Sequence, residues 1–335
     1  IQAVRFDYQK PEWQVIDRRI AQDFDRLRAV GQGSLSIAAR TLADDHWVVY
    51  FAPDDGPVVY YLYDRQSGHP ERLFVTRPEL EGYSLVPMRP VVITARDGLE
   101  LPSYLTLPVF GPNSERPLVL LVHGGPNARD RWQFDPRAQW LANRGYAVLQ
   151  VNFRGSTGFG KAFQNAGNGE WGIGAMQHDL TDAVRWAIDE GIADAKRVCI
   201  YGGSYGGYAV LAGLAFTPDL YTCGVDVVGP SNLKTLLQSI PPYWAPMKKE
   251  LILLVGDVEN DEMLNRRLSP LFHAEKIRAP LMVLQGANDP RVKIAESDQI
   301  VAAMRAKHRP VTYVVYPDEG HGLVRPENRL DANAR

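Results

Sequence analysis

The sequence predicts an α/β protein, built around a mostly parallel β-sheet with helices on both of its faces. Short apolar runs alternate with amphipathic stretches from about residue 89 onward. These runs lack the polar–apolar alternation of a half-exposed strand, as do strands buried on both faces of a parallel sheet. The pattern changes near residue 88, before which short β-like runs are separated by turn sequences. We therefore expect a helix and a β-meander over residues 1–88, and the α/β domain over residues 89–335.

The segment before residue 88 carries one predicted helix and three predicted strands. Apolar residues recur at roughly helical spacing over residues 16–30. The predicted strands cover residues 47–51, 58–63 and 72–75. Between them, residues 53–57 and 64–70 contain Pro, Asp and Gly, which favour tight turns. Short strands joined by such turns are typical of an antiparallel meander.

The α/β domain begins with a predicted antiparallel hairpin, in which residues 91–96 and 101–107 flank the turn Asp97-Gly98. Further strands are predicted at residues 117–123, 146–152, 197–202, 223–228, 280–286 and 311–316. Helices are predicted between them at residues 136–144, 178–190, 205–216 and 295–307. A hairpin that leads into strands alternating with helices indicates a mixed sheet that is parallel over most of its width.

Composition excludes several classes of function. Acidic and basic residues nearly cancel, with a formal net charge of -2, which gives no basis for strong binding to a nucleic-acid backbone. No apolar run approaches the roughly 18 residues of a membrane span, and no Cys/His spacing fits a metal site. We therefore expect no nucleic-acid partner, no membrane association and no metal site. The oligomeric state stays open, a homo-oligomer included.

The candidate nucleophile is Ser204, in the segment Gly202-Gly203-Ser204-Tyr205-Gly206. A G-x-S-x-G match is weak alone, because glycine and serine are common and serine also caps helices. Its context is informative, since a predicted strand ends at Gly202 and a predicted helix begins after Ser204. Glycines around the serine permit so sharp a turn, which exposes the hydroxyl at the carboxyl end of the sheet. This is the nucleophile turn of the α/β-hydrolase fold, so we expect that fold.

A serine of this kind needs a base and an acid, which follow it in chain order. Of the two histidines late in the chain, His308 ends a predicted helix, whereas His321 lies in a glycine-flanked loop after a predicted strand. We prefer His321 as the base. Asp289 follows the strand at 280–286 and is the preferred acid, although an ordinary turn aspartate is the alternative reading. The other aspartates considered are Asp219, Asp226, Asp257, Asp261, Asp298 and Asp318.

An oxyanion hole should come from two backbone N–H groups. One is that of Tyr205, at the start of the helix after the serine. The other is expected in the loop His123-Gly124-Gly125-Pro126, where glycines let the main chain approach a developing negative charge. Taken alone, this loop can equally be a plain turn.

A series of short motifs runs from residue 123 to residue 322. They are His123-Gly-Gly-Pro126, Asn152-Phe-Arg-Gly-Ser-Thr-Gly-Phe-Gly160, Glu170-Trp-Gly172, Gly202-Gly-Ser-Tyr-Gly-Gly-Tyr208, Ser269-Pro270, Gly286-Ala-Asn-Asp-Pro-Arg291 and Asp318-Glu-Gly-His-Gly322. In this order they resemble the prolyl oligopeptidase family of serine peptidases, nearest its acylaminoacyl-peptidase-like branch. The resemblance implies a cofactor-free hydrolase of peptides or acyl-peptides, with Gly125 as the second oxyanion donor.

The resemblance also assigns residues around the substrate. It implies that Arg291 holds a substrate carbonyl, although a structural ion pair with Asp289 is nearly as good a reading of the residues. Tyr243 and Trp244, in the stretch Pro241-Pro-Tyr-Trp244, are candidates for a wall of the specificity pocket, with core packing as the alternative.

The chain departs from the family before residue 88. Members usually carry a large β-propeller ahead of the hydrolase, whereas residues 1–88 suffice only for a segment resembling part of one. We expect either a piece of a longer protein or a missing substrate filter. A carboxylesterase with the same triad is therefore the alternative function, and a catalytically inactive binding module is a third.

Overall fold

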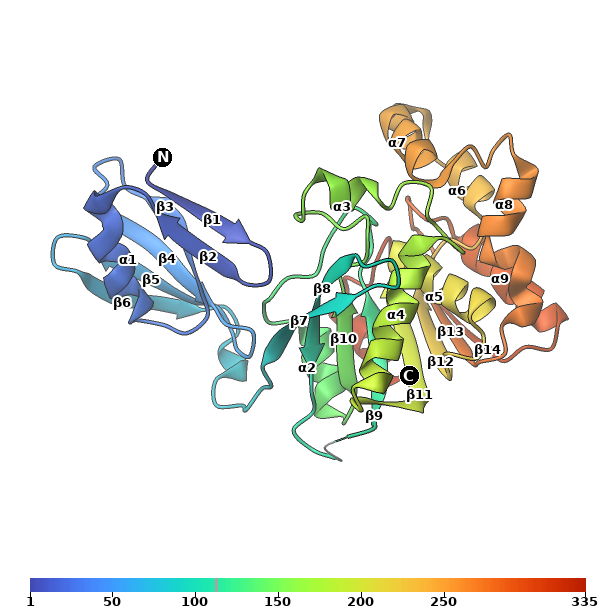
Figure 1. Cartoon of the computed structure of the whole chain (residues 1–335), viewed down its shortest axis with the longest axis horizontal. Coiled ribbons are helices and arrows are strands. Elements are labelled where there is room, and N and C mark those ends of the chain that lie inside the picture. The colour runs from blue at the N-terminus through green and yellow to red at the C-terminus, as the bar shows by residue number, and fades with distance from the viewer. Residues whose placement is uncertain (112–113) are drawn as a thin grey trace. The chain divides into compact units, whose positions relative to one another are not determined.

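The computed structural model describes residues 1–111 and 114–335 (Figure 1), and its internal contacts divide the chain into two compact units. The first unit comprises Ile1–Val91, Tyr104–Phe110 and Arg131–Gly145. The second comprises Val92–Ser103, Gly111–Asp130 and Tyr146–Arg335. Every candidate site residue belongs to the second unit.

The first unit contains two antiparallel sheets. Strands β1 (Ala3–Asp7) and β2 (Pro11–Val15) form a hairpin within a stretch where the sequence predicted no strand. A four-stranded sheet follows in the order β3-β4-β5-β6, with bounds β3 (Ser34–Arg40), β4 (His46–Ala52), β5 (Val59–Asp64) and β6 (His69–Val75). The predicted antiparallel meander is therefore present, with one strand more than predicted.

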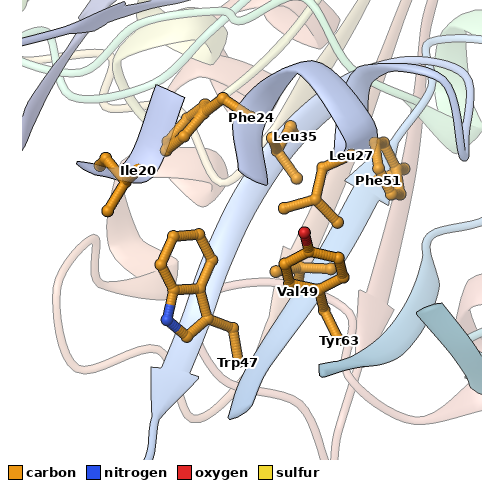
Figure 2. Close-up of a cluster of buried hydrophobic side chains, with 8 residues drawn as sticks. All are labelled: Ile20, Phe24, Leu27, Leu35, Trp47, Val49, Phe51 and Tyr63. Atoms are coloured by element: carbon orange, nitrogen blue, oxygen red, sulfur yellow. The ribbon is translucent and has the colours of Figure 1, made fainter. Parts of the chain in front are cut away.

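A hydrophobic core joins this sheet to helix α1 (Ala21–Arg28), which is shorter than the predicted helix over residues 16–30. Figure 2 shows the eight buried side chains Ile20, Phe24, Leu27, Leu35, Trp47, Val49, Phe51 and Tyr63. Alternate residues of β4 point into this cluster, as period-two side-chain geometry requires. The Tyr63 hydroxyl donates to Asp23 at 3.0 Å, so the buried polar end of the cluster is satisfied.

An eight-stranded sheet has the order β14-β13-β12-β11-β9-β10-β8-β7 (Figure 1). Its strands are β7 (Met88–Thr94), β8 (Glu100–Thr106), β9 (Arg116–Val122), β10 (Ala147–Val151), β11 (Ala193–Gly203), β12 (Cys223–Val227), β13 (Leu281–Gly286) and β14 (Val311–Tyr316). Six neighbouring strands, β14, β13, β12, β11, β9 and β10, pair in parallel. The predicted mostly parallel sheet is thus confirmed, and its parallel strands all end at the same edge.

Helices connect strands of this sheet, and a last helix follows β14. They are α2 (Pro136–Asn143), α3 (Lys161–Asn165), α4 (Ala175–Asp189), α5 (Tyr205–Phe216), α6 (Leu233–Gln238), α7 (Ala245–Val255), α8 (Glu262–Leu268), α9 (Ile294–Ala306) and α10 (Pro326–Ala334). Helix α5 packs on β9, β11 and β12, and α9 packs on β13 and β14. The predicted helices correspond to α2, α4, α5 and α9, whereas α3, α6, α7, α8 and α10 had no counterpart in the prediction. Over the described residues, no helix is long and apolar enough to cross a membrane.

Candidate active site

Ser204 lies in a sharp turn between β11 and α5. Its backbone angles, φ 59° and ψ -119°, are uncommon for a residue with a Cβ and mark a strained conformation. The Ser204 N–H donates to the carbonyl oxygen of Val227 on β12 at 2.9 Å, which anchors the turn. Neighbouring glycines make the close packing possible, since a Cβ on Gly206 would lie 2.3 Å from the carbonyl oxygen of Val122. The turn therefore has the geometry that the G-x-S-x-G segment predicts.

Two backbone N–H groups beside this turn are available to an anion. Tyr205 is the first residue of α5, so its N–H has no acceptor within the helix, and the Ser204 side chain does not cap it. Gly125, in the loop after β9, donates no backbone hydrogen bond within the described part of the chain. The loop lies directly on the turn, because a Cβ on Gly124 would be 3.0 Å from the Gly203 oxygen and 3.4 Å from the Ser204 Cβ.

His321 and Asp289 form a hydrogen-bonded pair. Asp289 follows β13 and His321 follows β14, so neighbouring parallel strands bring them to the same edge. The His321 Nδ1 donates to Asp289 Oδ2 at 2.7 Å, with the Asp289 side chain fully buried and that of His321 15% exposed. The N–H groups of Arg291 and Val292 donate to Asp289 Oδ1 at 2.8 and 2.9 Å. The imidazole is thereby oriented by a carboxylate that is itself fixed.

The loops that carry this pair are tied to each other. The Asn288 N–H donates to the Glu319 carbonyl oxygen at 2.9 Å, and its side-chain amide donates to the Pro317 oxygen at 2.7 Å. The Glu319 carboxylate accepts the N–H groups of Val324 and Arg325, which closes the loop beyond the histidine. Sequence reasoning missed Asn288 and Glu319, and only their places beside Asp289 and His321 hinted at these supporting contacts.

The rival aspartates all have partners other than His321. Asp219 pairs with Arg278, Asp318 with Arg325, and Asp298 accepts from the Tyr313 hydroxyl. Asp257 accepts from Asn260, Asp261 caps α8, and Asp226 accepts the Gly229 N–H. His308 is exposed beyond the end of α9. Geometry therefore singles out one acid–histidine pair at the sheet edge.

Ser204 follows β11 and His321 follows β14, so both residues lie at the carboxyl edge of the parallel strands. Within the described chain, the Ser204 hydroxyl has no hydrogen-bond partner. The hydrogen bond between a catalytic serine and its histidine is often long in enzymes without substrate and tightens when substrate binds. Ser204 is half-buried, so its hydroxyl is partly open to solvent.

Residues 152–156 after β10, part of a motif noted in the sequence, lie against the loop after β9. Asn152 Oδ1 accepts the Asp130 N–H at 2.8 Å, and Ser156 Oγ lies 2.9 Å from the Nε2 of His123. Arg154 donates from its backbone and its guanidinium to the fully buried Asp179. Sequence reasoning assigned no role to Ser156, because its partner is remote in the chain.

The residues expected around the substrate are less tightly defined. The Arg291 side chain is exposed and has no ion pair within the described residues, so an ion pair with Asp289 is not formed. Tyr243 is 77% exposed, which does not fit core packing, and its ring meets that of Trp244 edge-on at 5.9 Å. Both lie in the short helix η3 (Pro242–Trp244) before α7. Over the described residues, His, Cys, Asp and Glu form no cluster able to hold a metal ion.

Comparisons with known proteins show which proteins the chain resembles. The chain is 55% identical over 344 residues to dipeptidyl aminopeptidase BIII of Pseudoxanthomonas mexicana, covering 100% of this chain and 50% of that protein. It is 30% identical to the acylamino-acid-releasing enzyme of Arabidopsis thaliana, over 64% of this chain and 29% of that protein. The chain thus spans half the length, or less, of these curated relatives.

A solved structure and a family profile also match this chain. The puromycin-hydrolyzing peptidase of Mycobacterium tuberculosis superposes with a TM-score of 0.78 at 28% identity, over 86% of this chain and 44% of that one. The predicted α/β-hydrolase fold is therefore confirmed. The profile described as the prolyl oligopeptidase family matches residues 132–335. The chain belongs to the prolyl oligopeptidase family of serine peptidases.

Proposed function

We propose that this chain is the catalytic part of a serine peptidase that releases short units from the amino ends of peptides. Ser204 is the nucleophile, His321 the base and Asp289 the acid that orients it. The observation that carries the proposal is the 2.7 Å hydrogen bond between His321 and the fully buried Asp289. It lies at the sheet edge where a strained turn presents Ser204. An aspartate that only stabilises a turn bonds to nearby backbone N–H groups and does not require a buried histidine as partner.

The chemistry follows from these positions. His321 Nε2 removes the proton of Ser204 Oγ as the oxygen attacks the scissile carbonyl carbon. The carbonyl oxygen becomes an oxyanion, which accepts hydrogen bonds from the N–H groups of Tyr205 and Gly125. His321 then protonates the leaving amine, and an acyl-enzyme remains on Ser204. Water, deprotonated by His321, hydrolyses that ester and restores the serine. Throughout, Asp289 holds the imidazole and stabilises its cationic form.

The relatives suggest the type of unit released. One is a dipeptidyl aminopeptidase at 55% identity and another an acylamino-acid-releasing enzyme at 30%. Both names describe removal of a short amino-terminal unit, and the higher identity favours the dipeptide. In this proposal Arg291, which is exposed and follows Asp289 by two residues, donates to a carbonyl of the substrate main chain. Tyr243 and Trp244 offer aromatic surface for a substrate side chain.

The test compares substrates on the full chain. A dipeptidyl p-nitroanilide, an acetylated amino-acid p-nitroanilide and p-nitrophenyl butyrate report the three activities. We expect the dipeptidyl anilide to be cleaved, and Ser204→Ala or His321→Ala to lower its kcat by on the order of 10⁵–10⁶. His308→Ala is the matched control and should leave kcat unchanged. Hydrolysis of the ester alone would indicate a carboxylesterase, and undiminished cleavage by Ser204→Ala would overturn the assignment.

A further inference from the structure

We propose that Gln285 is a positioning residue for Asp289, and that Ser297 holds Gln285 in place. The inference rests on the proposed function, because it concerns how the acid of the triad is held against His321. We call residues 286–293, which run from the end of β13 to the start of α9, the acid loop. The Gln285 side chain does not contact the substrate in this account and acts through the main chain of that loop.

The first step is the presence of a polar side chain at this position. Gln285 lies one residue before the end of β13, a strand with neighbours on both sides in the sheet, and it is fully buried. Burial of an amide is unfavourable unless the amide is hydrogen-bonded. An apolar side chain of similar size would fill the same space without that cost. The glutamine therefore needs an explanation other than packing.

The second step is the pair of hydrogen bonds that the amide donates. Gln285 Nε2 donates to the carbonyl oxygens of Gly286 and Val292, at 2.9 and 3.2 Å. A carbonyl oxygen can only accept, so the amide nitrogen, and not the amide oxygen, must face both of them. Gly286 and Val292 lie on either side of Asp289 in the chain. One side chain therefore closes the acid loop from within the sheet.

The third step is the connection to the catalytic acid. The Asp289 N–H donates to the same Gly286 oxygen at 3.3 Å, and the Val292 N–H donates to Asp289 Oδ1 at 2.9 Å. The other carboxylate oxygen, Oδ2, accepts from His321 Nδ1 at 2.7 Å. Gly286 also packs on the loop that carries His321, since a Cβ on it would lie 2.2 Å from the Gly320 oxygen. Movement of either end of the acid loop would therefore turn the carboxylate away from the imidazole.

The fourth step is the support of the amide itself. The Ser297 hydroxyl donates to Gln285 Oε1 at 2.8 Å, so both the nitrogen and the oxygen of the amide are hydrogen-bonded. Ser297 is fully buried near the start of α9, which packs on β13 and β14. Hydrogen bonds that are shielded from water in this way are strong and costly to leave unpaired. Ser297 thus ties the acid loop to a helix that is fixed on the sheet.

The experiment asks whether Gln285 acts through Asp289 or only through stability. Gln285→Met keeps an unbranched side chain of similar size but removes all of its hydrogen bonds. Ser297→Ala removes only the hydroxyl and covers the case in which Gln285→Met does not fold. Thr181→Val is the matched control, because it removes a buried hydroxyl that donates to the Gln177 oxygen within α4, a helix that carries no residue of the triad.

Each substitution is made in the parent and in Asp289→Asn. For every variant kcat and KM are measured with the dipeptidyl anilide, with thermal unfolding as the check on folding. In the parent we expect Gln285→Met to lower kcat by about 10–100-fold, as misplacement of a catalytic group does. Ser297→Ala should lower kcat by about 3–10-fold, in keeping with loss of one hydrogen bond. Thr181→Val should keep the parental kcat.

The Asp289→Asn background supplies the readout that a merely structural role would not change. The carboxylate on which Gln285 acts is already absent there, so Gln285→Met and Ser297→Ala should each lower kcat by less than about 2-fold. The two sites are then coupled, as residues that act through one another must be.

Three results would overturn the proposal. One is parental kcat in folded Gln285→Met or Ser297→Ala. Another is loss of kcat by the same factor in the parent and in Asp289→Asn, since effects that are independent add in free energy. The third is a rise in KM alone, which would mean that the acid loop positions Arg291 and not Asp289. Failure of the proposed function looks different, because the parent protein would then not cleave the anilide at all.

Discussion

Asp226→Asn should make the stability of this protein depend less on pH between about pH 4 and pH 7. Asp226 lies on β12 and is fully buried. Its Oδ1 accepts the Gly229 N–H at 2.8 Å, whereas its Oδ2 has no hydrogen-bond partner in the described structure. Burial, opposed only by that hydrogen bond, raises the pKa of the carboxyl from 3.8 to about 7.

The sign follows from the two protonation states. As pH rises from 3.8 towards 7, the unfolded chain releases this proton while the folded chain retains it, so the free energy of unfolding falls. Above pH 7 both states are ionised and the loss is constant. The folded-state pKa of about 7 lies roughly two units above pH 5. The free energy of unfolding should therefore fall by about 3 kcal/mol between pH 5 and pH 8. Asparagine does not ionise, and the variant lacks this loss.

The assay is urea denaturation of parent and variant at several pH values from 5 to 8. The asparagine amide places N–H donors where Oδ2 has no partner, which costs about 1–3 kcal/mol at every pH. The variant should therefore be the less stable protein near pH 5 and gain about 3 kcal/mol on the parent by pH 8. A difference in unfolding free energy that stays constant over this range would refute the reasoning.

Three further predictions concern the active site. Asp289→Asn should lower kcat by about 10⁴, since the imidazole loses the group that fixes its tautomer, and wild-type turnover would exclude that role. Gly206→Ala should lower Tm and abolish turnover, because its Cβ would meet the Val122 oxygen at 2.3 Å; a folded, active variant would contradict this packing. Arg291→Gln should raise KM by about 10-fold with little change in kcat, in keeping with loss of one charged hydrogen bond, and an unchanged KM would exclude contact with the substrate.

The sequence was most informative where local chemistry and tertiary structure agree. The turn at Ser204 was predictable because strained strand-to-helix turns need glycines at fixed positions, as at Gly206. The pairing of His321 with Asp289 could be anticipated because both follow apolar strands whose ends must meet at one sheet edge.

Other features could not be predicted, because they depend on partners remote in the chain. Ser156 is an ordinary serine until β9 and β10 bring it to His123. Asp226 was one of several candidate acids, and what separates it from Asp289 is its partner, because it accepts from the Gly229 N–H whereas Asp289 accepts from His321. The hairpin of β1 and β2 escaped prediction because β1 carries no regular apolar alternation, although β2 does at Pro11, Trp13 and Val15.

The most direct test of the central claim is to locate the covalent adduct of a fluorophosphonate by peptide mass spectrometry. We predict one modified site, Ser204, in the full chain, and no adduct in Ser204→Ala. The His321→Ala variant should react much more slowly, because the serine then lacks its base. Modification at another serine, or undiminished labelling of Ser204→Ala, would contradict the assignment of Ser204 as the nucleophile.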